Sequence, residues 1–600
     1  MKTHADCRAA GEKIIFAGSP RVMPRLMVIV FLGIALLHAA PLLGAVQDTI
    51  QTNVPALKSV FAKDFYVGCL LSYPHIGFST DPYVSGQSSV VDTLGGYLIR
   101  YHMNSMGPGN NMKPQYTVDL AGSASAYTAA ATQSAKDSIN VHPIVKFNGN
   151  LIAQLNWAQR QGFKMRGHTL VWYSQTPGTG FFRTGYSSGG AYLTKDAMAS
   201  RMEFYIKEVV RQLHEGWPGL LLALDVVNEA VNDGSGTDRT ASNEWYTTFG
   251  DNTYIMKAFE VARKYTVQYG ETQIKLYYND YNTHDASKAD GIVRICGPIY
   301  RAGFLDGIGM QEHEAVGTPT PAAWKASYAK FDTVCSEMAV TEYDVKPDSY
   351  TGQGLAAQAN QVGALLKCFV EKSRRSGRGK IVNFTKDGLN DRYTFNVNSS
   401  FWDSTDHCKP AFFAAVAVGM NYHALDSLIA YADTLQQNRF TSASWATMAA
   451  ALTFATGAMA RDYSASVSAA DTLAHAKEAL TAGLAGLVPG TSAVAVGVDQ
   501  PILFALAQNY PNPFNPSTTI VYTISEFRYQ NSEIRVPGSS PVRLIVYDLL
   551  GREVAVLVNE QQQPGRHIVV FDGSRLSSGT YFYRLTAGDN TDIKRMLLLK

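Results

Sequence analysis

Short apolar runs recur between residues 55 and 421, and most of them end in polar side chains. Between the runs, apolar residues repeat at three- and four-residue spacing, which is typical of amphipathic helices. Eight runs alternate with such helices, and they lie in FYVGCLLSY, YHMNSM, FKMRGHTLVW, LLALDVVNE, IKLYYNDYN, DGIGMQEHE, EMAVTEYD and IVNFTKDGLND. The pattern predicts an α/β fold, a (β/α)8 TIM barrel with insertions over residues 55–421, whose site lies at the carboxyl ends of the strands.

A doubly wound open sheet is the alternative to the barrel. No glycine-rich dinucleotide fingerprint follows the first run, which favours the barrel. Beyond residue 421 the pattern changes. Residues 422–487 are Ala-rich and predict a small three-helix bundle, residues 488–501 predict a linker, and the apolar–polar alternation over 503–600 predicts a small Ig-like β-sandwich.

The N-terminus carries a segment of the kind that directs export. Arg21 and Arg25 precede the apolar stretch 26–37, and small residues follow up to Ala45. This order predicts a signal peptide over 1–45, with Met23 as an alternative start. A retained membrane anchor is the other interpretation, because the stretch approaches the length that spans a bilayer. The 52 Lys and Arg residues nearly balance 50 Asp and Glu residues, which gives no reason to expect nucleic acid as a partner.

Cysteine and histidine spacing indicates no metal site. Cys7 leaves with the signal peptide, and no zinc pattern matches the five that remain, namely Cys69, Cys296, Cys335, Cys368 and Cys408. These five allow at most two disulfides and one free thiol. The chain has no HExxH-like pair of histidines, and His168 and His313 lack an obvious third ligand. We expect neither a metal nor another cofactor.

Two carboxylates stand out at the ends of predicted strands. Glu229 follows the fourth strand, and Glu342 lies on the seventh. A carboxylate at one strand end is common for structural reasons, but a barrel brings these two ends face to face across its axis. Opposed carboxyls suit glycoside hydrolysis, in which one acid protonates the leaving oxygen and one carboxylate attacks the anomeric carbon. Neighbouring strand ends add His168, Trp172, Asn228, Gln311 and His313.

The barrel segment resembles family 10 of the glycoside hydrolases, the retaining endo-β-1,4-xylanases. Six motifs in the expected order carry the resemblance: HMNSMGPGNNMKP, RGHTLVWYSQTPG, LDVVNEA, LYYNDYN, DGIGMQEH and VTEYD. The resemblance implies that Glu229 is the general acid/base and Glu342 the nucleophile. Glu342 must then stay ionised among hydrogen-bond donors, while Glu229 must hold a proton until the glycosyl-enzyme forms.

The same resemblance implies supporting roles. His313 donates to the nucleophile and is held by Asp344, and Asn228 binds the sugar 2-hydroxyl, whose hydrogen bond strengthens in the transition state. Further positions that bind sugar or shape the site, mostly on the glycone side, match Asn110, Lys113, His168, Trp172 and Gln311. A satisfied core or rim residue is the alternative interpretation of each of these taken singly.

The chain departs from the family pattern at several sugar-contacting positions. Gly109 stands where the family usually has Glu, Leu224 where it has Trp, and Tyr173 where it has His. In the family, two Trp residues usually cover the glycone sugars, and they align with Asp387 and Phe395 of this chain. Each lost carboxylate or indole removes on the order of 1 to 3 kcal/mol of sugar binding. We expect weaker or altered glycone recognition that admits a decorated chain.

The two C-terminal segments carry resemblances of their own. Residues 422–487 resemble a FIVAR-type three-helix module, which is either a weak glycan-binding module or a spacer. ALAQNYPNPFNPSTTIVYTI, VRLIVYDLLGREVAVL and SSGTYFYRLTAG resemble the C-terminal sorting domain of type IX secretion substrates. That resemblance implies export through the outer membrane of a Gram-negative bacterium, with the secretion machinery as a partner. An Ig-like accessory domain without a sorting role is the alternative.

These observations favour a secreted or cell-surface retaining endo-β-1,4-xylanase that acts on xylan or a related plant cell-wall polysaccharide. A β-1,4-glucanase or mixed-linkage glucanase on the same barrel stays open, because one hydroxymethyl group separates glucose from xylose. So does a polysaccharide-binding protein that lost turnover. The joint presence of Glu229, Glu342, His313, Asp344 and Asn228 favours the enzyme, since binding alone does not need this set.

Overall fold

The computed structural model describes residues 51, 54–71, 93–374, 377–490, 504–524, 540–549, 551–588 and 590–599. The expected signal peptide and most of the expected linker lie outside the described residues. The chain divides into two compact units, Met1–Val488 and Pro489–Lys600.

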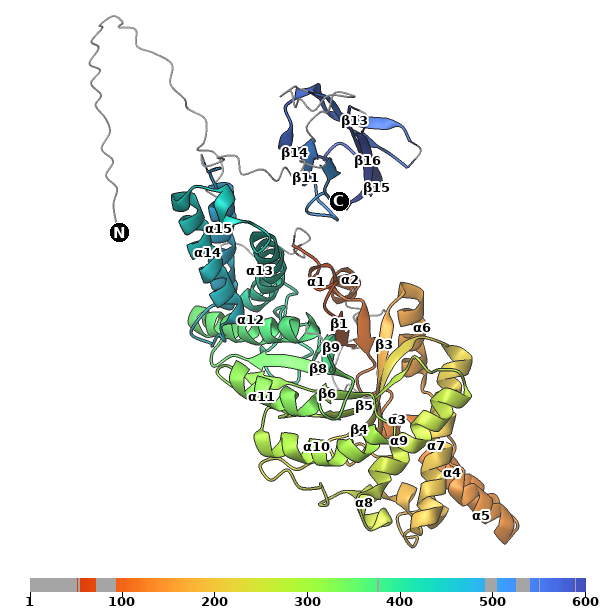
Figure 1. The fold of residues 1–600 in the computed structure, drawn as a ribbon. Coiled ribbons are helices and arrows are strands. Elements are labelled where there is room, and N and C mark those ends of the chain that lie inside the picture. The colour runs from red at the N-terminus through yellow and green to blue at the C-terminus, as the bar shows by residue number, and fades with distance from the viewer. Residues whose placement is uncertain are drawn as a thin grey trace, which may run out of the picture. The chain divides into compact units, whose positions relative to one another are not determined.

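Eight parallel strands close into a barrel in the first unit (Figure 1), in the order β1-β2-β3-β4-β5-β6-β8-β9, with β9 pairing back to β1. Their bounds are Tyr66–Leu70, Ser105–Gly107, Lys164–Trp172, Leu221–Asn228, Lys275–Asp280, Gly307–Met310, Glu337–Lys346 and Lys380–Lys386. A short strand, β7 (His313–Ala315), pairs with β8 beyond the end of β6. The predicted TIM barrel is confirmed, and every predicted run contributes one barrel strand.

The barrel strands are buried because helices cover them on the outside. β4 is buried at all positions but Leu222, which accounts for its nearly continuous apolar run. The described helices of this unit are α1 (Leu57–Val60), α2 (Thr93–His102), α3 (Pro114–Thr117), α4 (Leu120–Ala129), α5 (Gln133–Val141), α6 (Gly149–Gln161), α7 (Lys195–Gly216), α8 (Glu244–Phe249), α9 (Thr253–Gln268), α10 (Ala286–Arg301), α11 (Pro321–Phe331), α12 (Gly352–Arg374), α13 (Pro410–Ala432), α14 (Ser442–Ala460) and α15 (Ala469–Ala485). Three 3-10 turns span Thr179–Phe182, Thr184–Tyr186 and Gln437–Arg439.

Helix α7 illustrates how the sequence fixes these covering helices. Thr194 caps its N-terminus by accepting a hydrogen bond from the amide of Ala197. Met198, Met202, Tyr205 and Val209 then follow at three- and four-residue spacing, and all are buried. The helix therefore turns one apolar stripe toward the barrel.

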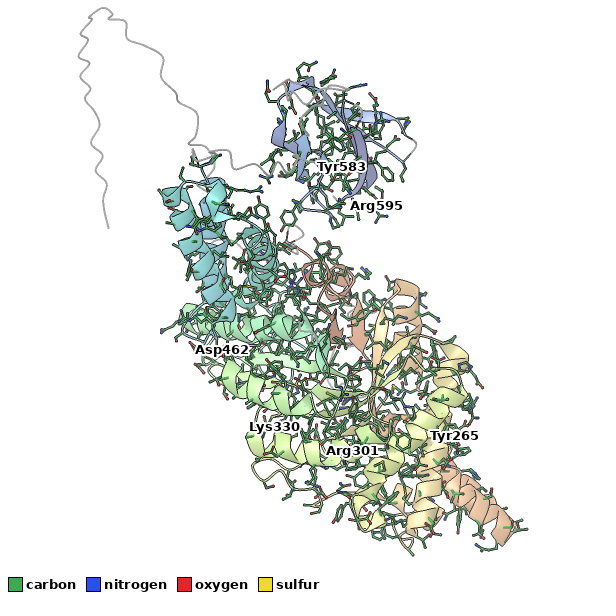
Figure 2. The ribbon with its side chains drawn as sticks, viewed as in Figure 1. Tyr265, Arg301, Lys330, Asp462, Tyr583 and Arg595 are labelled. Carbon is green, nitrogen blue, oxygen red and sulfur yellow. The ribbon has the colours of Figure 1, made fainter. Side chains whose placement is uncertain are left out.

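Helix α13 crosses the expected boundary between the barrel and the three-helix segment at residues 421–422 without a break. It packs on α12 and α15, and α14 packs on α15 (Figure 1). One apolar cluster joins Ala364 of α12 to Val418 and Leu425 of α13 and to Leu473 of α15. Polar contacts add to this packing, since Asp462, labelled in Figure 2, pairs with Lys325 of α11, and Asn360 donates to the Ala465 carbonyl at 3.0 Å. Residues 433–487 are therefore docked on the outer helices of the barrel.

Helix α13 is also the one described helix that is long and apolar enough to cross a membrane. Half of its most apolar window is buried inside the protein. Phe412, Ala415 and Val418 are fully buried against neighbouring elements. Its apolar composition therefore serves packing between α12 and α15.

The second unit is a β-sandwich of two antiparallel sheets. One sheet has the order β10-β11-β14 and the other β13-β12-β15-β16. Their bounds are Ala505–Leu506, Ser517–Ile524, Ser540–Tyr547, Glu553–Gln562, Gly565–Asp572, Gly579–Ala587 and Asn590–Leu598 for β10 to β16. On β11, buried residues alternate with exposed or half-buried ones as the sequence predicted. The hydroxyl of Tyr583 on β15 donates to the Ala507 carbonyl at 2.8 Å and ties the two sheets together (Figure 2).

All five cysteines of the described residues are unpaired. Four of them are buried, and Cys408 is half-buried. Burial raises the pKa of Cys69, Cys335 and Cys368 to about 12. These thiols are therefore inert core groups and form no disulfide with one another.

Candidate active site

Glu229 lies directly after β4, where its backbone adopts a left-handed conformation with φ of 54°. Such a conformation is uncommon for a residue with a side chain, and such residues cluster at active sites and ligand-binding segments. The Trp172 indole donates to Oε2 at 3.0 Å, and the amides of Asn228 and Gln311 donate to Oε1 at 3.0 and 2.8 Å. Glu229 is only 7% exposed. Three donors from three strand ends thus fix this carboxyl in one orientation.

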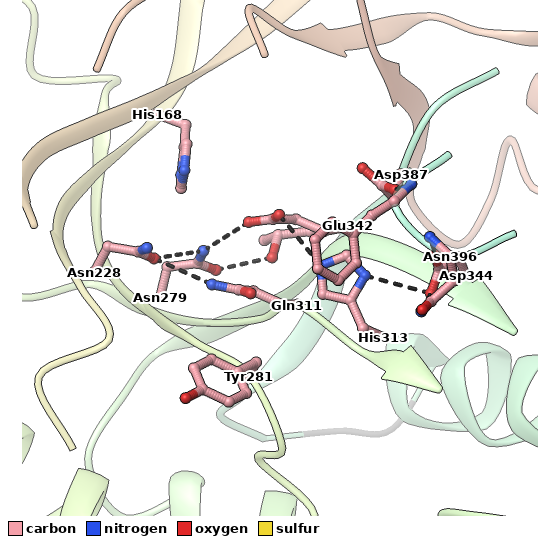
Figure 3. A network of polar contacts seen from close by, with 12 residues as sticks. His168, Asn228, Asn279, Tyr281, Gln311, His313, Glu342, Asp344, Asp387 and Asn396 are labelled. Carbon is pink, nitrogen blue, oxygen red and sulfur yellow. Dashed lines mark hydrogen bonds and ion pairs between the residues drawn. The ribbon is translucent and has the colours of Figure 1, made fainter. Parts of the chain in front are cut away.

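Glu342 lies on β8 and is the first member of a polar chain (Figure 3). Nε2 of His313 lies 3.5 Å from its Oε2, and Nδ1 of His313 lies 3.3 Å from Oδ1 of Asp344. Asp344 is fully buried and also accepts from the Asn396 side chain at 3.1 Å and the Ser399 hydroxyl at 3.0 Å. The imidazole is therefore held between two carboxylates by a buried anchor.

The polar contacts from Asp344 through His313 control the charge of Glu342. Burial by itself raises the pKa of Glu342, but the hydrogen bond from His313 and nearby positive charges outweigh it and lower the pKa to about 2. Burial likewise disfavours a charged imidazole, yet Asp344 and Glu342 outweigh it and raise the pKa of His313 to about 11. Glu342 is thus a carboxylate and His313 an imidazolium throughout the neutral range.

Asn279, at the end of β5, links the two glutamates and was missed by sequence reasoning. Its side-chain amide donates to Asn228 Oδ1 at 3.0 Å and to Glu342 Oε1 at 3.2 Å (Figure 3). Its own oxygen accepts from the Thr341 hydroxyl at 2.8 Å. The signal was present, since Asn279 ends one of the apolar runs in LYYNDYN. Its role depends on contacts that only the closed barrel creates.

The remaining predicted residues lie around the same strand ends. Lys113 donates to the side chains of Asn110 and Gln175, both at 2.7 Å, and its ammonium lies 4.6 Å from the centre of the Trp172 ring. His168, at 9% exposure, is held by Asp225 at 3.0 Å. A small recess lies beside Glu342 and is lined by Leu70, Gly107, Arg166, His168, Asp225, Thr341, Glu342 and Thr385. The structure therefore brings the sequence-predicted residues of strands β2 to β8 to one end of the barrel.

Phe395 and Asp387 occupy the positions that align with the two missing Trp residues. The Phe395 ring lies 5.1 Å from the His313 ring and is 77% exposed, which leaves one aromatic face open beside His313 and Glu342. Asp387 is 8% exposed and accepts from the Phe395 backbone amide at 2.5 Å. Burial raises the pKa of Asp387 to about 7. A buried acid thus stands where an indole was expected.

Two other departures have local structural causes. Gly109 has φ of +56°, and an added Cβ would meet the Leu71 carbonyl oxygen at 3.1 Å, so any side chain there carries a backbone cost. Leu224 is fully buried, and its Cδ1 would lie 2.7 Å from a Cβ added at Gly167. Leu224 therefore belongs to the barrel wall, and its inclusion among the sugar-contacting positions was wrong.

Tyr173 is half-buried and differs from Leu224 in this respect. Its ring lies 4.4 Å from the Arg239 guanidinium. Arg239 in turn donates to the Glu229 backbone carbonyl at 2.8 Å. Tyr173 thus packs on the arginine that holds the Glu229 backbone.

Comparison with known proteins agrees with this geometry. Residues 57–418, more than half of the chain, match the family model described as glycosyl hydrolase family 10. The chain belongs to glycosyl hydrolase family 10. The match covers the whole barrel from α1 into α13, and both glutamates lie within it.

Two relatives are 30% and 31% identical to this chain over the residues that align. Endo-1,4-beta-xylanase Y of Acetivibrio thermocellus is 30% identical over 393 residues, which are 62% of this chain and 33% of that protein. Bifunctional endo-1,4-beta-xylanase XylA of Ruminococcus flavefaciens is 31% identical over 321 residues, 53% of this chain and 30% of that protein. The chain therefore spans about a third of the length of these two relatives.

A solved structure gives the same result. The CBM22-1–GH10 modules of the Clostridium thermocellum endo-1,4-beta-D-xylanase 10B, complexed with xylohexaose, superpose with a TM-score of 0.51 at 30% identity. The superposition covers 60% of this chain and 67% of that one.

The second unit also has a family match. Residues 508–599 match the model of a secretion system C-terminal sorting domain. This domain marks the protein as exported, either to the medium or to the cell surface. The FIVAR-like nature of residues 422–487 remains a prediction.

Proposed function

We propose that this member of glycosyl hydrolase family 10 is a retaining endo-β-1,4-xylanase. The observation that carries the proposal is the chain from Asp344 through His313 to Glu342, because it keeps a nucleophilic carboxylate ionised with Glu229 linked to it through two amides. A binding site for neutral sugars alone has no need of a buried imidazolium held between two carboxylates.

In the first step, Glu229 donates its proton to the glycosidic oxygen while Glu342 attacks the anomeric carbon. The bond to the leaving sugar breaks, and a glycosyl ester forms on Glu342. In the second step, Glu229 takes a proton from a water molecule that attacks the same carbon and releases Glu342. Asn228, held by Asn279 and Gln311, presents its amide to the sugar 2-hydroxyl.

The proposed substrate is xylan or a related plant cell-wall polysaccharide. Two relatives are named endo-1,4-beta-xylanases, and the superposed structure holds xylohexaose. On the glycone side, the exposed Phe395 ring offers a stacking face, while buried Asp387 offers a hydrogen-bonding group in place of an indole. We infer altered glycone recognition that tolerates decorated chains.

The type IX secretion machinery is the proposed protein partner of the sorting domain. The match over residues 508–599 supports this partner. The domain belongs to a separate compact unit, so recognition by the machinery does not require any barrel residue. Export and hydrolysis are therefore separable in this proposal.

The test measures reducing-sugar release from xylan, arabinoxylan and β-glucan by the purified full chain and by its Glu342→Ala variant. Glu260→Gln, on an α9 side chain that is 49% exposed, is the matched control. We expect release from xylan and arabinoxylan that the control retains and Glu342→Ala lowers by about 10⁴-fold or more. Preference for β-glucan would replace the xylanase with a glucanase. Binding of a polysaccharide without release from any would leave a binding protein.

A further inference from the structure

A second group of ionisable side chains lies behind the nucleophile chain and has no part in the proposed hydrolysis. Glu312 and Glu314 flank His313 on the segment after β6, and His284 lies in the loop between β5 and α10. One ligand atom from each of these three residues lies within 4.8 Å of the other two. Nδ1 of His284 and Oε1 of Glu314 are 3.5 Å apart.

The burial of this group makes its charge costly. Glu312 is fully buried and Glu314 is 3% exposed. No Lys or Arg of the described chain forms an ion pair with either carboxyl, and the basic groups near Glu314 are His284 and the adjacent His313. Two adjacent buried carboxyls without such a partner must share a proton or share a cation.

Unpartnered atoms point to the cation. Oε1 of Glu312 accepts from the Thr283 hydroxyl at 2.6 Å, but Oε2 is buried and has no hydrogen-bond partner. Nδ1 of His284 is also buried without a hydrogen-bond partner. Buried polar atoms are almost always satisfied, and a bound ion is one explanation for two such atoms without a hydrogen bond in a three-residue cluster.

The donor set and its dimensions fit one cation. Zn²⁺ binds imidazole nitrogen and carboxylate oxygen at about 2.0 to 2.2 Å, which places neighbouring ligand atoms about 3.4 Å apart in a tetrahedral site. A cluster within 4.8 Å needs little contraction to reach this spacing. The His284 side chain is 19% exposed, so a water molecule can complete the sphere from that side.

We propose that His284, Glu312 and Glu314 bind one divalent cation of the Zn²⁺ class. The cation joins the β5–α10 loop to the segment that carries His313. The Glu312 carbonyl also accepts from the Asp344 amide at 3.2 Å. The site therefore supports both His313, which contacts the nucleophile, and Asp344, which holds His313. Its role is structural, and it takes part in neither step of hydrolysis.

The experiment is calorimetric titration of the chelator-treated full chain with ZnCl₂, followed by MnCl₂ and CaCl₂, with thermal unfolding measured in parallel. Binding needs no substrate, so its failure is distinguishable from failure of the xylanase proposal. We expect one equivalent of Zn²⁺, a higher Tm with Zn²⁺, and weaker binding of Ca²⁺, which disfavours imidazole.

Two variants test the ligands, and two control for other sites. His284→Ala and the nearly isosteric Glu314→Gln should each weaken Zn²⁺ binding at least tenfold. His475→Ala, an exposed histidine on α15, and Asp387→Asn, in the neighbouring His313–Asp344–Asp387 group, should retain it. Absence of stoichiometric binding would overturn the proposal. If Glu314→Gln also raises the Tm of the metal-free protein, the two carboxyls share a proton instead. Binding that survives in His284→Ala and Glu314→Gln would overturn it as well.

Discussion

At the scale of residues, the partners of each buried carboxyl decide whether it is ionised. Glu342 and Asp387 are both buried near His313, but burial sets the direction of the pKa shift only for Asp387. For Glu342 the imidazolium outweighs burial and the pKa falls to about 2, whereas for Asp387 burial wins and the pKa rises to about 7. Glu342 is thus kept charged, as the proposed nucleophile must be, and Asp387 is kept largely neutral on the acid side of pH 7.

Loss of the imidazolium should move the acid limb of the pH profile. In His313→Ala, burial acts on Glu342 without the charge-assisted hydrogen bond, which typically contributes about 1.5 to 3 kcal/mol. The Glu342 pKa then rises, and the acid limb of kcat/KM moves up by about 1 to 2 pH units. Initial rates on xylan from about pH 2 to pH 8 measure the limb, with exposed His475→Ala as the control. An acid limb at the wild-type pH would contradict the role assigned to His313.

Asp387 should make the folded protein less stable as the pH rises. The unfolded carboxyl ionises near pH 4, whereas the folded one, with its pKa raised to about 7, keeps its proton longer. Between these pH values the folded state binds more protons, so the Asp387 contribution to stability falls as pH rises through about 7. Asp387→Asn should therefore raise the Tm at pH 8 and change it little at pH 4. Thermal unfolding at both pH values decides, and an equal change at the two would refute the raised pKa.

Sequence reasoning named most of the side chains that the structure brings together at the strand ends. Glu229, Glu342, His313 and Asn228 stand at strand ends inside recognisable motifs. Asn279 and the His284–Glu312–Glu314 cluster were missed because their contacts join residues that are far apart in the sequence. His284 and Glu314 are 30 positions apart in the chain, yet their side chains lie 3.5 Å apart once the barrel closes.

At the scale of elements, periodicity predicted every barrel strand, but α13 runs through the predicted boundary at residues 421–422. α13 is apolar on the faces that meet both α12 and α15, so its sequence pattern carries no mark of where the barrel ends. The composition change at residue 422 falls inside this helix. The Ala-rich segment therefore continues the barrel's outer layer.

A chain that ends at residue 421 should be less stable than one that ends at residue 488. The shorter chain loses Leu425 and the α14–α15 pair and exposes Ala364 and Val418, which are fully buried. This exposure costs on the order of 2 kcal/mol or more. Circular dichroism melts of the two chains measure the difference. Equal Tm values would show that residues 422–487 are an independent spacer.

At the scale of the whole molecule, two units divide the work. The barrel unit holds both glutamates and all of their described partners, and the sorting unit has its own apolar core around Ile520, Leu544 and Tyr583. The alternation of apolar and polar residues predicted this second core well, because each strand of a sandwich buries one face.

Removal of residues 489–600 should separate export from hydrolysis. We expect kcat/KM on xylan to stay within about twofold of the full chain, because no described contact of the two glutamates comes from this unit. Export into the medium by a bacterium with the type IX machinery should be lost. Assays of cell and medium fractions measure both. Undiminished export would leave the second unit as an accessory domain.

The most direct test of the central claim is to trap the glycosyl-enzyme. A 2-deoxy-2-fluoro-β-xylobioside with a good leaving group slows the second step more than the first, so the ester accumulates. Intact-mass and peptide mass spectrometry should find one added 2-deoxy-2-fluoro-xylobiosyl group on Glu342 and none in Glu342→Gln. An adduct on another carboxyl, or turnover of xylan with inversion at the anomeric carbon and no adduct, would contradict the account.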